Sequence, residues 1–331
     1  MAKDKSESKK ERNTFLNGHV WWKYLISVIA CIVYLLPIWV TICVSFTALG
    51  DNSSRLYISI KDDTPDPLTG NRDESGLFWL GNYGKTFGST ASEADYQAME
   101  WIYPNEPRTS DRVIPKGNYS MLNAIKNSAI LMVGVILVEV VTSAFAAYPL
   151  SRNRSKLNKF LLSAILGVMM IPGLSIVVGV YQEFVTFGMI NTYWGIILIT
   201  AAFGLPMCIY LYSNFIRTIP DSLDEAAAID GAGPGQTFFR VLLPQLKPVT
   251  VTVIIMRGIG AWNEYTYSLY ILQKPSMMNV SLTIKQYFSE NLTDYGAAAA
   301  AAILAIIPVI AVYLFLQRYF IQGAVDSAVK G

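Results

Sequence analysis

Long apolar runs, separated by short polar segments, make up most of this 331-residue chain. A helix needs roughly 20 apolar residues to cross a hydrocarbon core of about 30 Å. The runs that reach this length predict six membrane-spanning helices, at 22–46, 122–148, 160–184, 193–212, 249–272 and 296–320. The third run is the least uniform, because Gln182 and Glu183 lie near its end. The pattern predicts an all-α membrane protein.

Basic residues are distributed unevenly around these runs. They occur in the N-terminal tail, in the loop after the second run, in the loop after the fourth run and after the last run. With six spans, all of these segments lie on one side of the membrane. Lys and Arg near span ends favour the cytoplasmic side, so both termini are expected to be cytoplasmic.

The segment between the first two runs is then extracytoplasmic. Residues 48–121 hold eleven acidic and seven basic residues and are rich in Pro, Gly, Asp and Asn, which favours turns. We expect an ordered cap, and a passive insertion is the alternative. The predicted organisation is a tail (1–21), a first span (22–46), the insertion (47–121), a core of five spans (122–321) with a cytoplasmic loop (214–248), and a second tail (322–331).

Composition supports this reading and excludes several other functions. Hydrophobic residues make up 53% of the chain and charged residues 15%, against about 25% charged in a soluble domain. A net charge of +2 gives no surface for nucleic acid. The only histidine, His19, excludes a histidine-based metal site or catalytic triad, and the three cysteines form no CxxC pair.

The loop between the fourth and fifth runs predicts two short helices. Pro220, followed by Asp221 and Ser222, is typical of a helix start, and the acidic residues of the first turn favour the helix dipole. Gly231 ends this first helix, and a second helix at 236–243 is expected to end at Pro244. The alanines at 226–228 leave a shallow surface onto which a partner protein can fit.

The spacing of residues in this loop carries a family resemblance. It matches the "EAA" loop of importer permeases in ATP-binding-cassette (ABC) systems, through Glu225, Ala226, Ala227, Gly231, Val241, Leu243 and Pro244. Val241 stands where isoleucine is usual. Five further segments resemble maltose-type carbohydrate permeases, specifically the MalG-like subunit. They are Asn127-Ser128, Ala146-Ala147-Tyr148 with Arg152, residues 191–195, Trp262-Asn263-Glu264, and Gly323 with Ala328-Val329-Lys330-Gly331. The resemblance covers about 120–331 and the first span, and the insertion is longer than that subunit would predict.

The resemblance implies a type I ABC importer permease fold in a multi-pass protein of the bacterial cytoplasmic membrane. It implies a heterodimer with a second related permease, two cytoplasmic ATPase subunits, an extracytoplasmic solute-binding protein and an oligosaccharide substrate. The chain lacks a Gly-x-x-x-x-Gly-Lys-Ser/Thr phosphate loop, so it is expected not to be the ATPase. As a transporter subunit it is expected to be no enzyme and to bind no cofactor or metal, with ATP and Mg on the ATPase. The residues assigned to ATPase coupling are Asp224, Glu225, Ala226, Ala227, Gly231, Leu243 and Pro244.

Polar residues inside the spans are candidates for the substrate pathway, because they usually face the bundle interior or water. They are Glu139, Arg257, Trp262, Asn263 and Glu264. Arg257 and Glu264 are seven residues apart, which places them on one face of a helix, where both could face the pathway. Amide and carboxylate groups bind sugar hydroxyls and an aromatic ring covers an apolar sugar face, but a structural role for Glu264 is the favoured alternative. Glu139 needs a partner, a water or a proton.

Two other transport functions remain open on the sequence. One is a permease for a glycerol phosphoester or polyol, which a basic outward cavity would indicate. The other is an ion-coupled secondary transporter that uses Glu139 and Glu264 as proton sites. The EAA loop and the lack of an obvious inverted repeat count against the second.

Overall fold

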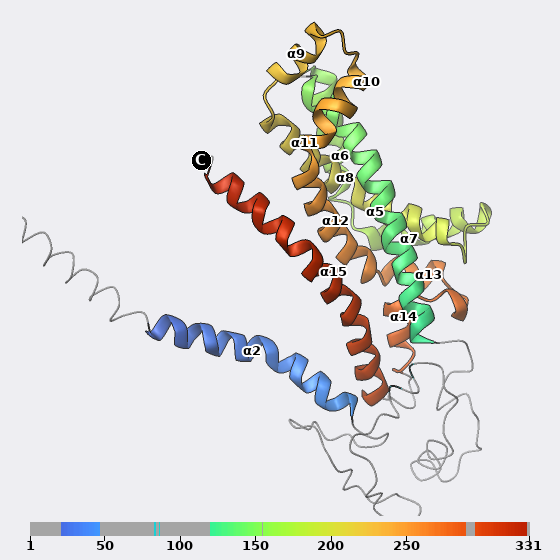
Figure 1. Ribbon diagram of the computed structural model, residues 1–331. Coiled ribbons are helices and arrows are strands. Elements are labelled where there is room, and N and C mark those ends of the chain that lie inside the picture. Colours follow the sequence, from blue (N-terminus) through green and yellow to red (C-terminus); the bar gives the residue numbers. More distant parts are fainter. Residues whose placement is uncertain are drawn as a thin grey trace, which may run out of the picture.

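The computed structural model describes residues 21–46, 83, 86, 120–153, 155–288 and 295–329, with side chains described as far as Phe315. The elements in this part of the chain are helices (Figure 1). They are α2 (Trp21–Ser45), α5 (Met121–Arg152), α6 (Lys156–Val168), α7 (Gly173–Thr186), α8 (Tyr193–Thr218), α9 (Ser222–Ile229), α10 (Pro234–Thr237), η1 (Phe238–Leu242), α11 (Leu243–Gln245), α12 (Lys247–Trp262), α13 (Thr266–Ile271), η2 (Pro275–Met277), α14 (Val280–Lys285) and α15 (Tyr295–Val329).

Four single helices are long and apolar enough to cross a membrane. They are α2, α5, α8 and the first part of α15, and two bent helix pairs raise the number of candidate spans to as many as six. The all-α prediction is therefore confirmed for the described residues, and the number of candidate spans is four to six.

The third predicted span is not one helix. The run 160–184 is divided between α6 and α7, which meet at an angle of 93°. Pro172 caps the start of α7 in an extended conformation. Proline has no backbone N–H and disfavours helical geometry in the residue before it, so the helix breaks there although the run stays apolar. Figure 1 shows α7 lying across the direction of α5.

The fifth predicted span is also interrupted. The run 249–272 forms α12 as far as Trp262, and the chain then leaves the helix before α13 begins at Thr266. The Glu264 carboxylate accepts hydrogen bonds from the backbone N–H groups of Tyr267 and Ser268, both at 2.8 Å. These bonds satisfy the first N–H groups of α13 and so start a new helix within the apolar run.

Other predicted bounds need smaller corrections. Helices α5 and α8 extend four and six residues beyond their predicted ends, to Arg152 and Thr218. The second tail (322–331) is not separate from the last span, because α15 continues to Val329. Most of the insertion at 47–121 lies outside the described residues. Its described Tyr83 places its hydroxyl 3.0 Å from the Ser45 hydroxyl at the end of α2.

The bundle is organised around α5. This helix packs along α8 and α12, and α15 lies against both α12 and α2. In Figure 1, α9 and α10 lie at one end of the bundle, α13 and α14 lie at the other end, and α2 extends away from it. One buried cluster, which includes Ala144, Tyr212 and Leu242, joins α5, α8 and η1 at the α9 end.

Candidate functional site

Helix α9 ends in a motif that depends on glycine. Gly231 has φ +78°, a backbone conformation that residues with a side chain rarely adopt. Its N–H donates to Ala228 O at 3.0 Å, and the N–H of Ala232 donates to Ala227 O at 2.9 Å. These paired bonds are those of a Schellman motif, which satisfies the last carbonyls of a helix. The predicted first helix and its stop at Gly231 are confirmed.

The second helix of the loop differs from the prediction. In place of one helix at 236–243, the chain forms α10, the π-helical turn η1 and α11. The expected end at Pro244 is wrong, because Pro244 lies in the first turn of α11 and the helical path continues into α12. Proline is tolerated at this position since a first-turn N–H has no partner within its own helix.

The second half of the loop is anchored in the bundle. Phe238 is 3% exposed, and its ring centroid lies 5.0 Å from that of Phe145 and 5.5 Å from that of Tyr148, both on α5. Leu242 is fully buried in the same cluster. Aromatic rings at these distances add to the free energy of burial. The turn η1 is therefore part of the hydrophobic core.

The first half of the loop is attached to α5 by charged groups. Arg152 Nη1 donates to Ile219 O at 2.9 Å and to Asp221 Oδ1 at 2.6 Å, and Nη2 lies 2.8 Å from Asp224 Oδ2. The Tyr148 hydroxyl donates to Asp224 Oδ1 at 3.1 Å. Sequence reasoning used Tyr148 and Arg152 only as marks of resemblance. The contact could have been predicted from opposite charges, because a basic residue ends the second span and acidic residues begin the loop helix.

The remaining predicted coupling residues divide between an exposed face and the interior. Glu225 and Ala226 are exposed, whereas Ala227 is 7% exposed and faces the rest of the chain. Ile229, which sequence reasoning did not single out, is 87% exposed. Leu243 and Pro244 are also exposed, in α11.

Glu139 and Arg257 form a buried ion pair in the middle of the bundle. The Nε of Arg257 donates to both carboxylate oxygens of Glu139, at 2.9 and 2.8 Å, and Nη2 lies 2.7 Å from Oε1. Nη2 also donates to Thr200 O at 3.3 Å, and the Cys208 thiol donates to Glu139 Oε2 at 3.7 Å. The carboxylate is therefore the common partner of groups on α8 and α12.

This geometry bears on two of the pathway candidates. The Glu139 side chain is 0% exposed and is held by Arg257. Arg257 does not share an open face with Glu264, because its guanidinium is turned toward Glu139. Asp, Glu, Lys and Arg inside membranes usually pair with one another in this way.

The three adjacent candidates at the end of α12 do not form one surface. Trp262 is 3% exposed and packs with Met121 and Ala301, whereas Asn263 is exposed and donates to Ile259 O at 3.1 Å. Glu264 caps α13 and also accepts a hydrogen bond from the Ser268 hydroxyl. The favoured structural role for Glu264 agrees with these contacts.

A second polar network, which sequence reasoning missed, fixes the α14 end of the bundle. The side chain of Asn279 donates to Glu264 O at 2.5 Å and to Ser268 Oγ at 2.9 Å, and its oxygen accepts from Leu282 N at 3.0 Å. Asn127 on α5 donates to Met278 O at 2.9 Å, and Ser128 accepts from Val280 N at 3.0 Å. The segment after α12 is thus bonded to α5.

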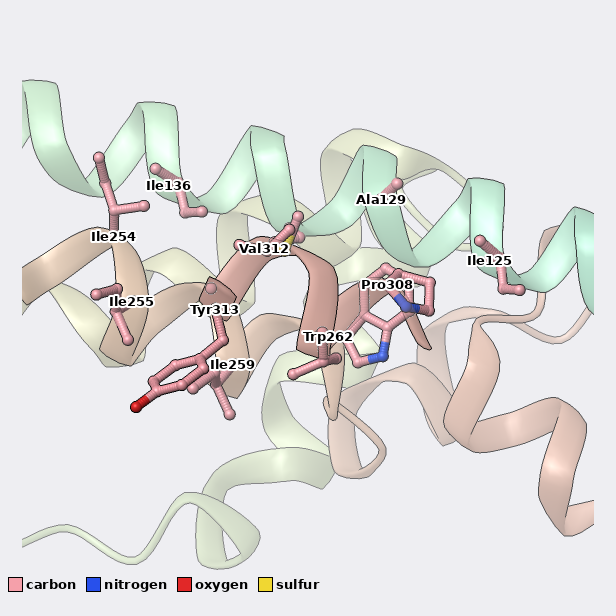
Figure 2. A pocket seen from close by; sticks show the side chains of 13 residues that line it. Ile125, Ala129, Ile136, Ile254, Ile255, Ile259, Trp262, Pro308, Val312 and Tyr313 are labelled. Atoms are coloured by element: carbon pink, nitrogen blue, oxygen red, sulfur yellow. The ribbon is translucent and has the colours of Figure 1, made fainter. Parts of the chain in front are cut away.

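An apolar groove of about 280 Å³ lies between α5, α12 and α15. Figure 2 shows Ile125 and Ile136 on one side, Ile259 and Trp262 on another, and Tyr313 at its edge. Its lining is almost entirely apolar. Sugar hydroxyls lose hydrogen bonds to water when buried, so this groove offers them no adequate partners.

Comparisons with known proteins agree with this architecture. Residues 139–325 match the family model described as "Binding-protein-dependent transport system inner membrane component". The melibiose/raffinose/stachyose import permease protein MelC of Bacillus subtilis (strain 168) is 36% identical over 244 residues, which cover 73% of this chain and 88% of MelC. The multiple sugar-binding transport system permease protein MsmG of Streptococcus mutans is 29% identical, and the match covers 94% of this chain and 97% of MsmG.

The fold is shared with a solved transporter. A chain in the crystal structure of a bacterial ABC transporter involved in the import of the acidic polysaccharide alginate superimposes with a TM-score of 0.66. The match covers 93% of this chain and 98% of that chain at 18% identity, which shows the fold alone. The family model spans more than half of the chain and the helices fit a multi-pass protein, so the chain belongs to the family of inner-membrane permease components of binding-protein-dependent ABC transport systems.

Proposed function

We propose that this chain is the transmembrane permease subunit of an ATP-driven oligosaccharide importer. In this proposal, the loop from Ile219 to Leu246 is the site at which an ATPase subunit docks. The observation that supports it is that one half of the loop is buried in the core and the other half is exposed. Phe238 and Leu242 anchor one half in the core, while the other half carries Glu225 and Ile229 on an exposed face.

A docking segment of this kind needs both an exposed contact and a rigid attachment. Ile229 supplies apolar area, and Glu225 supplies a carboxylate for a charge-assisted hydrogen bond to an Arg or Lys of the ATPase. Arg152 and the Phe238 anchor then carry a displacement of α9 into α5 and α12. ATP-driven closure of the ATPases would bias the bundle between inward-facing and outward-facing states.

The proposal includes a topology and a set of partners. The α6–α7 pair counts as one span and α12 as another, which together with α2, α5, α8 and α15 gives six spans with both termini and the α9 end in the cytoplasm. The partners are a second related permease in a heterodimer, two ATPases that bind ATP and Mg, and an extracytoplasmic solute-binding protein. The chain itself is a transporter subunit that binds no cofactor.

The proposed substrate class is supported by the names of similar permeases and by the pairing of the buried charged residues. The names of similar permeases include melibiose, raffinose, stachyose, trehalose and maltodextrin, which are uncharged sugars. Arg257 is neutralised by Glu139 of the same chain and so offers no free positive charge to a phosphoester. Both carboxylates of the ion-coupled alternative, Glu139 and Glu264, already accept hydrogen bonds within the chain. A neutral oligosaccharide therefore fits best.

The test is reconstitution of the chain with its permease, ATPase and binding-protein partners in proteoliposomes. Raffinose, maltodextrin, trehalose and glycerol-3-phosphate are compared for uptake and for stimulation of ATP hydrolysis. We expect an oligosaccharide to stimulate both, and stimulation by glycerol-3-phosphate alone would overturn the substrate assignment.

Docking is tested separately by binding of the ATPase to the purified permease pair. Burying an isoleucine side chain contributes about 1.5–3 kcal/mol, so Ile229→Ala is expected to weaken ATPase binding at least about tenfold. Leu157→Ala is the matched control, because Leu157 is also exposed but lies on α6 outside the loop. Unchanged affinity in Ile229→Ala and Glu225→Lys together would exclude the loop as the docking site.

A further inference from the structure

We propose that Glu139 and Arg257 are a positioning pair that fixes the register of α12 against α5 and α8. In this role the pair makes the three helices move together when the loop is displaced. The inference rests on the proposed function and assigns the coupling of ATP hydrolysis to transport to residues inside the bundle, away from the docking surface.

The geometry of the pair is directional. Arg257 Nε lies within 2.9 Å of both oxygens of the carboxylate, and Nη2 contacts Oε1 and the carbonyl of Thr200. A planar guanidinium that contacts both carboxylate oxygens restricts rotation as well as distance. Because Thr200 is on α8, sliding or rotation of α12 would break contacts with two helices at once.

Gly204 on α8 provides the space that the pair occupies. A Cβ at this position would collide with the Glu139 carboxylate and with the Arg257 guanidinium. By contrast, a Cβ at Gly179 on α7 would meet nothing within 4 Å. Close approach of α8 to the ion pair therefore depends on the missing side chain at position 204.

Stability alone does not account for such a pair. Removing two charges from water is costly, and apolar side chains of similar volume often stabilise a protein equally well. In some proteins a buried polar or ionic group fixes a single register of the packed helices, and this is the role that we assign to the pair. This advantage matters most between elements that have to transmit a displacement.

The position of the pair suits transmission from the loop. Helix α12 begins at Lys247, immediately after the loop, and Arg257 lies about 15 Å further along it at 1.5 Å per residue. Helix α5 contacts the loop through Arg152 and carries Glu139 about 20 Å further into the bundle. The same two helices are thus joined at the loop and again by the ion pair.

The measurement is the number of sugar molecules transported per ATP hydrolysed, in proteoliposomes that contain the whole transport complex. Raffinose is the probe. The variants are the double replacement Glu139→Met with Arg257→Met, which preserves side-chain volume, and Arg257→Lys, which preserves charge but not the planar fork. Gly204→Ala displaces the pair without changing either member, and Gly179→Ala and Glu183→Gln are the matched controls.

We expect the ratio to fall about fivefold or more in the three test variants and to stay at the wild-type value in the controls. A role in folding alone would reduce the amount of assembled complex and leave this ratio unchanged. Wild-type ratios in the double methionine variant and in Arg257→Lys would overturn the proposal. Arg257→Lys decides the question where the methionine pair does not assemble.

Failure of this inference is distinguishable from failure of the proposed function. If the wild-type complex transports raffinose with ATP hydrolysis and the variants keep its ratio, only the positioning role is wrong. If the wild-type complex transports none of the sugars tested, the proposed function is wrong, and the positioning role is rejected with it.

Discussion

Arg152 on α5 lies 2.8 Å from the carboxylate of Asp224 on α9, and the two side chains are only 15% and 22% exposed. The same guanidinium bonds to Asp221 and to the carbonyl of Ile219. One arginine therefore holds the start of α9 to the end of α5.

Loss of this arginine should uncouple the loop from α5. Hydrogen bonds to charged groups contribute about 1.5–3 kcal/mol each, so Arg152→Ala is expected to reduce sugar uptake about tenfold or more. Tyr148→Phe, which removes one hydroxyl donor to Asp224, should have a smaller effect. Uptake in proteoliposomes checks both, with Lys159→Ala on the exposed surface of α6 as the control. Wild-type uptake in Arg152→Ala would show that the attachment is dispensable.

The positive φ of Gly231 makes a backbone prediction. A side chain in the left-handed region costs roughly 1–2 kcal/mol, so Gly231→Ala should loosen the end of α9 and weaken ATPase binding about tenfold. Gly233→Ala is the comparison, because Gly233 has φ −73° and open space around its Cα. Equal ATPase affinities in the two variants would contradict this account.

Two adjacent phenylalanines should differ in their effect on stability. Phe238 is buried in the core, whereas Phe239 is 54% exposed. Truncation of a buried phenylalanine costs about 3–5 kcal/mol, so Phe238→Ala should lower the thermal unfolding midpoint of the purified permease more than Phe239→Ala. Fluorescence-monitored unfolding in detergent measures the difference. Equal midpoints would mean that η1 is not anchored as described.

Glu264 should affect stability without affecting sugar recognition. Glu264→Gln retains one oxygen acceptor but loses the second, which leaves a backbone N–H at the start of α13 unpaired at a cost of about 1–3 kcal/mol. We expect a lower unfolding midpoint and an unchanged apparent KM for raffinose. Tyr270→Phe, at an exposed position of α13, is the control. A raised KM with unchanged stability would instead place Glu264 in the sugar pathway.

The sequence predicted those features that depend on local chemistry. Apolar length identified the helices α2, α5 and α8, and the Gly231 stop followed from glycine alone. The hydropathy pattern does not reveal the 93° bend at Pro172, because the segments on both sides of it are apolar. It missed the break after Trp262 for a different reason, since a side-chain cap from Glu264 decides where α13 begins.

Contacts between distant residues were beyond this reasoning. Glu139 was expected to need a partner, but Arg257 is 118 residues away in the sequence, and only the packing of α5 against α12 brings the two together. Spacing within one helix instead related Arg257 to Glu264. Burial of Ala227 beside the exposed Ala226 likewise depends on how α9 sits against the bundle.

Helix α5 touches every polar cluster described above. Asn127 and Ser128 bond to Met278 and Val280 at the start of α14, Glu139 holds α12, and Arg152 holds α9. Helix α5 has 32 residues and is about 48 Å long, with Pro149 near its end. If it tilts as one body, a gap that opens at one of its ends closes at the other, so a passage open to both sides at once would require these bonds to break.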